Sequence, residues 1–162
     1  MIEKDLTMIE ILGIAIQAEI ASYKMYRKIA REVRNSTSRD RFTTLAREEQ
    51  SHQLMLENLY RKSGGKISIS LPKKNLKVTK LEIKGSSPID IIQTAIEKEK
   101  ETRKFYLEAF KKATDKSGRF ILQYLADFEQ NHQRILEHEF KTLTEYPMWW
   151  DYEGPGIQFI GP

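Results

Sequence analysis

Apolar residues recur with the period of an α-helix in four separate segments of the chain. Within each segment they return every three or four positions, which places them on one face of a helix. The segments cover residues 6–33, residues 39–62, residues from 88 to a turn at 114–118, and residues from that turn to about 145. We therefore expect an all-α protein with four long amphipathic helices.

The connections between these segments indicate how the helices are arranged. Polar residues at 35–38 and the turn at 114–118 are short links, which join antiparallel neighbours. Residues 63–87 lack helical period and are long enough to run the length of a bundle. Alternating apolar residues there leave a short strand and an irregular loop equally open. The pattern predicts an antiparallel four-helix bundle over residues 1–146, with a long crossover between the second and third helices.

The last segment, residues 147–162, is rich in aromatic residues but has no helical pattern. Trp149, Trp150 and Phe159 lie among glycine and proline residues, so we expect a non-helical tail. Aromatic side chains at this density are poorly placed in water. We expect them to pack against the bundle or against a sister subunit, in a homodimer or a higher homo-oligomer.

The two halves of the predicted bundle repeat each other at an offset of 80 residues without a gap. The matching positions are concentrated on the inward stripes, which is typical of a duplicated helical hairpin. In each half, a Glu-x-x-His motif begins 30 residues after a glutamate on the first stripe. The polar pairs are Glu19 and Glu99, Tyr26 and Tyr106, Glu49 and Glu129, and His52 and His132. The repeat predicts pseudo-two-fold symmetry.

A glutamate in the middle of an apolar stripe is costly unless it is paired or protonated. A glutamate and a histidine three residues apart lie on one helix face and can reach a common cation. One such pair is often an ordinary surface pair, but two copies in register favour a dinuclear metal site. Oxygen and imidazole ligands suit two iron ions, with manganese or zinc as other options. The predicted ligands are Glu19, Glu49, His52, Glu99, Glu129 and His132.

Other polar residues lie close to the predicted ligands in the helical pattern. Tyr26 and Tyr106 follow the first-stripe glutamates by seven residues and either hydrogen-bond the site carboxylates or take part in electron transfer. Gln53 and Gln133 follow the histidines directly and either donate to the ligands or only line the rim of the bundle. Glu48 falls on an outer face, where we expect it to serve solubility.

The chain has no cysteine, and this limits its chemistry. Disulfides, thiolate catalysis, iron–sulfur clusters and cysteine-ligated metal centres are excluded. No apolar stretch is long and uncharged enough to span a membrane, so no membrane contact is expected. The first ten residues include three acidic ones and no positively charged segment leading to a cleavage site, so we expect a cytoplasmic protein.

The net charge of +4 reflects 27 basic and 23 acidic residues. If four glutamates bind cations in the core, 19 acidic residues remain against the 27 basic ones, an excess of eight on the exterior. A basic exterior favours acidic partners. Because most basic residues are interleaved with acidic ones on helix surfaces, nucleic acid is not the expected partner.

Residues 15–26 and the run Leu-Ala-Arg-Glu-Glu-Gln-Ser-His at 45–52 resemble the rubrerythrin branch of the ferritin-like superfamily. The second half repeats the pattern, and the resemblance covers about residues 6–145. It implies a ferritin-like bundle that binds two metals. Rubrerythrins reduce hydrogen peroxide at such a site, and ferritins oxidise ferrous iron with dioxygen. The implied roles are terminal ligands for Glu19 and Glu99, bridging ligands for Glu49 and Glu129, and capping ligands for His52 and His132.

The chain departs from the rubrerythrin pattern in two respects. Rubrerythrins carry a rubredoxin-like domain with four cysteines, whereas here only the aromatic tail follows the bundle. Electrons would therefore come from a separate donor protein, for which the basic exterior favours an acidic one. Rubrerythrins also carry an additional glutamate three residues after the third-helix ligand, where this chain has Thr102. This second departure weakens the expectation of efficient peroxide reduction.

Three functions are compatible with these features. The leading one is a rubrerythrin-like dinuclear-iron oxidoreductase that reduces hydrogen peroxide or dioxygen with an external electron donor. The first alternative is a ferroxidase that handles iron without an organic substrate. The second is a helical interaction module in which the metals only stabilise the bundle. The tyrosine pair beside the ligands favours redox chemistry.

Overall fold

The computed structural model describes residues 6–66, 79 and 85–153. The four predicted helices are present, and a short 3-10 helix follows them. The elements are α1 (Met8–Glu32), α2 (Ser36–Lys62), α3 (Pro88–Lys112), α4 (Lys116–Glu145) and η2 (Pro147–Asp151). Most of the segment between α2 and α3 lies outside the described residues. The two alternatives for this segment, a short strand and an irregular loop, are therefore not tested.

Side-chain caps place two helix starts earlier than predicted. α2 begins at Ser36, not at residue 39, because the Asn35 side chain accepts a hydrogen bond from the Ser38 amide at 3.0 Å. α4 begins at Lys116 because the Asp115 carboxylate accepts one from the Gly118 amide at 2.6 Å. The polar residues that were interpreted as turns therefore form the first turns of these helices.

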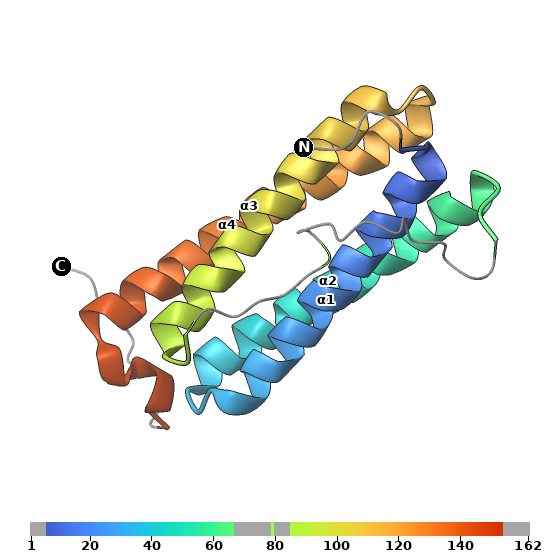
Figure 1. Ribbon diagram of the computed structural model, residues 1–162. Coiled ribbons are helices and arrows are strands. Elements are labelled where there is room, and N and C mark those ends of the chain that lie inside the picture. Colours follow the sequence, from blue (N-terminus) through green and yellow to red (C-terminus); the bar gives the residue numbers. More distant parts are fainter. Residues whose placement is uncertain (1–5, 67–78, 80–84, 154–162) are drawn as a thin grey trace.

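The four helices form two hairpins, α1 with α2 and α3 with α4, that lie side by side (Figure 1). α1 also contacts α3, and α2 contacts α4, with opposite chain directions in both pairs. α2 ends at the end of the bundle opposite to where α3 begins, so the connection over residues 63–87 joins opposite ends. This confirms the antiparallel bundle with a long crossover. No helix in the described part of the chain is long and apolar enough to cross a membrane.

The apolar core consists of two clusters at opposite ends of the bundle. Burial of each large aliphatic or aromatic side chain contributes about 1.5–3 kcal/mol, so both ends are strongly held. Fully buried members of the first cluster include Ile11, Leu12, Leu56 and Leu122. Those of the second include Ile29, Phe42, Leu45 and Ile92. Between the two clusters lies a layer of buried glutamates and histidines.

The start of the C-terminal segment packs against the chain's own bundle. Trp149 and Trp150 are only 7% and 5% exposed, as expected for buried aromatic residues. The prediction of a non-helical tail is wrong at its start, because η2 covers Pro147–Asp151. The Trp150 carbonyl accepts hydrogen bonds from the amides of Arg34 and Asn35 at 3.1 and 3.0 Å, which fastens η2 to the α1–α2 turn. Phe159 lies outside the described residues, and the homo-oligomer stays a prediction.

A buried polar network also ties η2 to α2 and α4. The Trp149 indole donates to the Ser38 hydroxyl at 3.0 Å, and this hydroxyl donates to the Glu139 carboxylate. Glu139 is 1% exposed and pairs with Arg41 at 2.5 Å. Ser38 is therefore the hydrogen-bond partner of two buried groups, the indole N–H of Trp149 and a carboxylate oxygen of Glu139.

Replacing Ser38 should destabilise the bundle much more than replacing its exposed neighbour Ser36. The change Ser38→Ala leaves the Trp149 indole and one Glu139 oxygen without their partner, which costs about 1–3 kcal/mol. The change Ser36→Ala in the same helical turn should stay within about 0.5 kcal/mol of wild type. Chemical denaturation of the three proteins measures the difference. Equal stabilities for the two variants would contradict the network.

Candidate metal centre

Each of the four helices contributes to the polar layer between the two apolar clusters. α1 and α3 supply Glu19 and Glu99, while α2 and α4 supply a Glu-x-x-His pair each. All six predicted ligands are buried, with exposures of 0 or 1%. Helical spacing explains their burial. Each ligand lies on the same helix face as the apolar residues of its stripe, and this face packs against the bundle axis.

The six side chains form two overlapping groups whose ligand atoms lie within 4.8 Å of one another. One group contains Glu19 and His52, and the other contains Glu99 and His132. Glu49 and Glu129 belong to both groups. Two glutamates are thus placed to be shared between two ions, as the resemblance implied for them.

The imidazoles face the carboxylates through the same ring nitrogen. The Nδ1 atom of His52 lies 3.3 Å from a Glu49 oxygen and 3.5 Å from a Glu19 oxygen. The Nδ1 atom of His132 lies 3.3 Å from Glu49 and 3.6 Å from Glu99. The two rings are stacked with centroids 5.7 Å apart. The pseudo-two-fold arrangement predicted from the repeat holds only in part for these contacts, because both histidines approach Glu49, whereas His132 lies 3.9 Å from Glu129, the repeat equivalent of Glu49.

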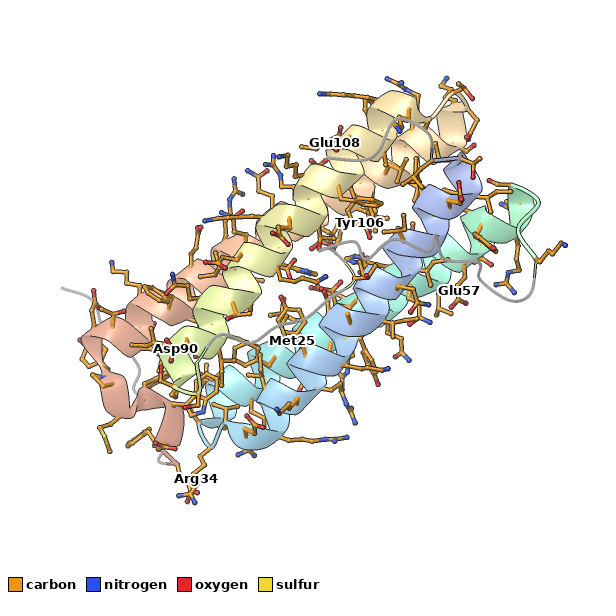
Figure 2. All side chains as sticks on the ribbon, viewed as in Figure 1. Met25, Arg34, Glu57, Asp90, Tyr106 and Glu108 are labelled. Atoms are coloured by element: carbon orange, nitrogen blue, oxygen red, sulfur yellow. The ribbon has the colours of Figure 1, made fainter. Side chains whose placement is uncertain are left out.

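The two tyrosines hydrogen-bond the terminal glutamates, each across to the other half of the chain. The Tyr26 hydroxyl donates to Glu99, and the Tyr106 hydroxyl donates to Glu19. Figure 2 shows Tyr106 between α3 and α1, whereas Glu57 lies on the outer side of α2. Burial, together with the negative charge of these carboxylates, raises the pKa of both phenols well above the ordinary value. Both hydroxyls therefore stay protonated and hold the glutamates in place.

Several buried atoms of this layer have no hydrogen-bond partner among the described residues. A buried polar atom without a partner costs about 1–3 kcal/mol, so a group of them needs an explanation. Metal ions would satisfy them together, and the donor set of four carboxylates and two imidazoles suits iron, manganese or zinc. The residues therefore fit a dinuclear metal centre. The candidate ligand atoms are Glu19 Oε2, Glu49 Oε1, Glu99 Oε2, Glu129 Oε1 and His132 Nδ1. Lys98 Nζ and Arg103 Nε are also buried without a hydrogen-bond partner among the described residues, but as cations they would not bind a metal.

Burial and mutual repulsion divide the protons unequally among the carboxylates. Burial, with the charge of Glu49 beside it, raises the pKa of Glu19 to about 8. Burial and the neighbouring carboxylates also raise the pKa of Glu129 well above its ordinary value. Burial acts in the same direction on Glu49, but hydrogen bonds with Glu19 and the two histidines outweigh it and lower the pKa of Glu49. Without metal, Glu19 and Glu129 therefore hold protons at neutral pH.

The histidines also hold protons in the metal-free site, but in their case burial lowers the pKa and contacts with carboxylates raise it. Burial lowers the pKa of His52, but its contacts with Glu19 and Glu49 are stronger and raise it to about 9. Burial likewise opposes protonation of His132, yet its contacts with Glu48, Glu49 and Glu99 raise this pKa to about 12. Metal binding must displace these protons, because imidazole binds a metal in its neutral form.

Glu48 is a site residue that the helical pattern missed. The interpretation as an outer-face solubility residue is wrong, because its carboxylate lies 2.9 Å from Nε2 of His132. Glu48 points away from the apolar stripe of α2, but α4 lies on that side and brings His132 to it. The packing of α2 against α4 supplies this contact, and no sequence motif signals it.

The two glutamines beside the histidines line the rim of the bundle. Gln53 donates to Glu57 and Gln133 donates to Glu137, each at 2.7 Å and each to the next turn of its own helix. Of the two alternatives left open, the rim position is the one observed. The glutamines therefore do not orient the candidate ligands.

We expect the metal-free protein to lose stability as the pH rises from about 5 to about 9. The folded pKa of Glu19 is about 8 against an ordinary 4.5, and that of His52 is about 9 against 6.5. Between each pair of values the folded state binds more protons than the unfolded state, so stability falls with rising pH. The lowered pKa of Glu49 acts in the opposite direction, but only below its ordinary value of 4.5.

Thermal melts against pH, with and without metal, measure this effect. With chelator present, the melting temperature should fall by at least about 3 °C across this range, equivalent to about 1 kcal/mol. With saturating metal the slope should reverse, because the ions favour the deprotonated ligands. The same slope in both series would show that these side chains do not share a charged cluster.

A family model described as rubrerythrin matches residues 10–140. Among solved structures, a hypothetical protein from Pyrococcus furiosus is 27% identical with a TM-score of 0.77, covering 88% of this chain and 93% of that chain. No significant match was found among curated proteins.

Two bacterioferritins share the fold at lower sequence identity. The one from Rhodobacter capsulatus, solved with a metal-free dinuclear site and heme iron, is 16% identical with a TM-score of 0.75, covering 97% of this chain and 99% of that chain. The one from Desulfovibrio desulfuricans, described by its diiron site in different catalytic states, is 14% identical with a TM-score of 0.71, covering 95% and 94%. These likenesses confirm the ferritin-like four-helix bundle.

The region matched by the family model contains all six candidate ligands and both tyrosines. It begins within α1 and ends within α4, so it includes the whole polar layer and most of the two apolar clusters. The match agrees with the resemblance that the repeated Glu-x-x-His motif carries. The chain belongs to the rubrerythrin family.

Proposed function

We propose that this protein is a dinuclear-iron oxidoreductase that reduces hydrogen peroxide, or dioxygen, with electrons from a separate donor. The observation that carries the proposal is the overlap of the two ligand groups in Glu49 and Glu129. An arrangement of this kind holds two ions close together, which suits a reaction that takes two electrons at one site. The diiron site named for the Desulfovibrio desulfuricans bacterioferritin supports iron as the metal.

In this proposal each ligand has a distinct task. Glu49 and Glu129 would be shared between the two ions, while Glu19 with His52 and Glu99 with His132 would each hold one of them. Bound iron supplies the electrons that the cleavage of an O–O bond requires. Reduction of one hydrogen peroxide consumes two electrons and two protons and yields two molecules of water.

The two tyrosines support this chemistry by orienting the terminal ligands. Tyr26 and Tyr106 are fully buried, and their hydroxyls donate to Glu99 and Glu19. Each phenol thereby restricts its glutamate to one orientation and excludes water from that side of the site. A carboxylate held in this way needs little rearrangement during a reaction.

Electrons would be delivered by a second protein. The chain has no cysteine, so it cannot supply a thiolate-ligated iron centre of its own. Its basic residues outnumber the acidic ones by four, and four of the acidic ones lie in the site. A basic exterior attracts an acidic donor and speeds its association.

Ferroxidase activity is the second candidate, and Thr102 is the observation that favours it. The Thr102 hydroxyl donates to the Lys98 carbonyl of its own helix at 3.0 Å and is committed to that contact. The site therefore has the six-residue ligand set without the additional glutamate that rubrerythrins carry. In this alternative ferrous iron is the substrate and dioxygen is the oxidant. The third candidate is a helical interaction module in which the metals only stabilise the bundle.

The experiment compares two oxidants on protein loaded anaerobically with two ferrous ions per chain. Absorbance of ferric iron is followed after rapid mixing with hydrogen peroxide or with dioxygen. The proposal predicts faster oxidation by peroxide and repeated turnover once a reductant is added. Faster oxidation by dioxygen, with iron retained beyond two ions per chain, would establish the ferroxidase instead.

Two variants of α2 provide the matched control. The change Glu49→Gln removes a shared ligand and should abolish most of the ferric signal. The change Glu57→Gln removes a carboxylate on the outer side of α2 that accepts a hydrogen bond from Gln53, so the signal should be unchanged. Oxidation that survives Glu49→Gln would place the reaction outside this site.

A further inference from the structure

The internal repeat is broken at one pair of positions that contact the histidines. At the offset of 80 residues, Glu48 of the first half corresponds to Phe128 of the second. Each directly precedes a shared glutamate, Glu49 or Glu129, and each reaches across from its own helix toward the other. A carboxylate and a phenyl ring thus occupy equivalent places in the two halves.

Glu48 contacts His132 on the side of the ring that faces away from the cluster. Nε2 of His132 lies 2.9 Å from the Glu48 carboxylate, while Nδ1 faces the glutamates. The carboxylate accepts a hydrogen from Nε2, so in the neutral ring the lone pair is left on Nδ1, where a metal would bind. A carboxylate in this position also makes the imidazole a stronger ligand.

Phe128 takes the equivalent place beside His52. The two ring centroids lie 5.0 Å apart with the planes at 80°, an edge-to-face contact. A phenyl ring packs well here but offers no carboxylate to accept the imidazole hydrogen or to increase the basicity of the ring. The His52 ring therefore lacks the support that Glu48 gives to His132.

The ligand sets of the two metal positions are alike. Each position has one terminal glutamate, one histidine, and the same two shared glutamates. Each terminal glutamate also accepts a hydrogen bond from a buried tyrosine. The pair formed by Glu48 and Phe128 thus distinguishes the two histidines, while the buried Lys98, which directly precedes Glu99 and corresponds to Ala18 in the first half, is a second difference.

A surface pocket between α2 and α4 approaches the His52 side of the site. The pocket has a volume of about 260 Å³, and its lining includes Ser51 and His52 from α2 and Tyr124 and Phe128 from α4. Glu48 also lines the pocket, so the carboxylate that supports His132 lies at the same opening. An ion or a chelator in this pocket would meet His52 directly.

We propose that the two metal positions are unequal. The position formed with His132 and Glu99 binds a divalent transition-metal ion first and more tightly. The position formed with His52 and Glu19 binds second, and it exchanges its ion with solvent through the pocket between α2 and α4. Glu48 is the positioning residue that sets this order. The proposal rests on the dinuclear site proposed above.

Titration of the metal-free protein with cobalt(II) tests the order of binding. Visible absorbance and calorimetry both follow the two steps without any enzymatic assay. Wild type should show two steps whose Kd values differ by at least about tenfold. Glu99→Ala should remove the tight step and Glu19→Ala the weak one. Two equal steps would overturn the inference but leave the dinuclear site intact, whereas absence of any binding would refute both.

Three further variants test the part played by Glu48 and Phe128. Glu48→Ala should weaken the tight step by about 10–100-fold and leave the weak one nearly unchanged. Phe128→Glu should strengthen the weak step. Asp127→Ala is the control, because it also removes one carboxylate next to the site, but an exposed one that bonds to Gln123. Equal effects of Glu48→Ala and Asp127→Ala would mean that Glu48 acts only through its negative charge and not through its contact with His132. This result would overturn the proposal.

The exchange route has its own test. Ser51 is exposed and lines the pocket, so Ser51→Trp should fill the opening without removing a ligand. In protein loaded with two cobalt ions and mixed with excess zinc, the faster phase of cobalt loss should slow in this variant, while the Kd values stay the same. An unchanged rate for that phase would exclude the pocket as the route.

Discussion

Four carboxylates and two imidazoles share one buried layer of the bundle, and their charge must be compensated inside it. The apolar clusters on both sides of the layer prevent water from doing so. Without metal, the compensation comes from protons, which are held because burial and neighbouring carboxylates raise the pKa of Glu19 and Glu129, and contacts with carboxylates raise the pKa of both histidines. Two divalent cations would replace these protons. The same constraint thus accounts for the orphaned oxygens, the shifted pKa values and the fit to a dinuclear centre.

The rest of the fold holds this layer in place. The caps and the two apolar clusters fix the helices, and the network of Ser38, Glu139 and Trp149 fastens the end of the bundle. The two tyrosines connect the hairpins directly, since each bonds the glutamate of the opposite half. The site is therefore assembled only when both hairpins are packed together. Within this near-symmetric frame, Glu48 and Phe128 distinguish the two sides.

Much of this arrangement follows from local sequence pattern. The helical period predicted four helices, and the repeat predicted which six side chains meet, because both depend on spacing within a helix. The contacts that were missed depend on how helices pack against each other. Glu48 lies off its own stripe and meets His132 of α4, and Glu139 pairs with Arg41 of α2. Spacing within one helix carries no information on such partners.

If two metal ions share Glu49 and Glu129, anomalous diffraction from crystals of the iron-reconstituted protein will locate both ions. We expect two peaks per chain, one beside Glu19 and His52 and one beside Glu99 and His132. A single peak, or peaks only at surface carboxylates, would contradict this expectation.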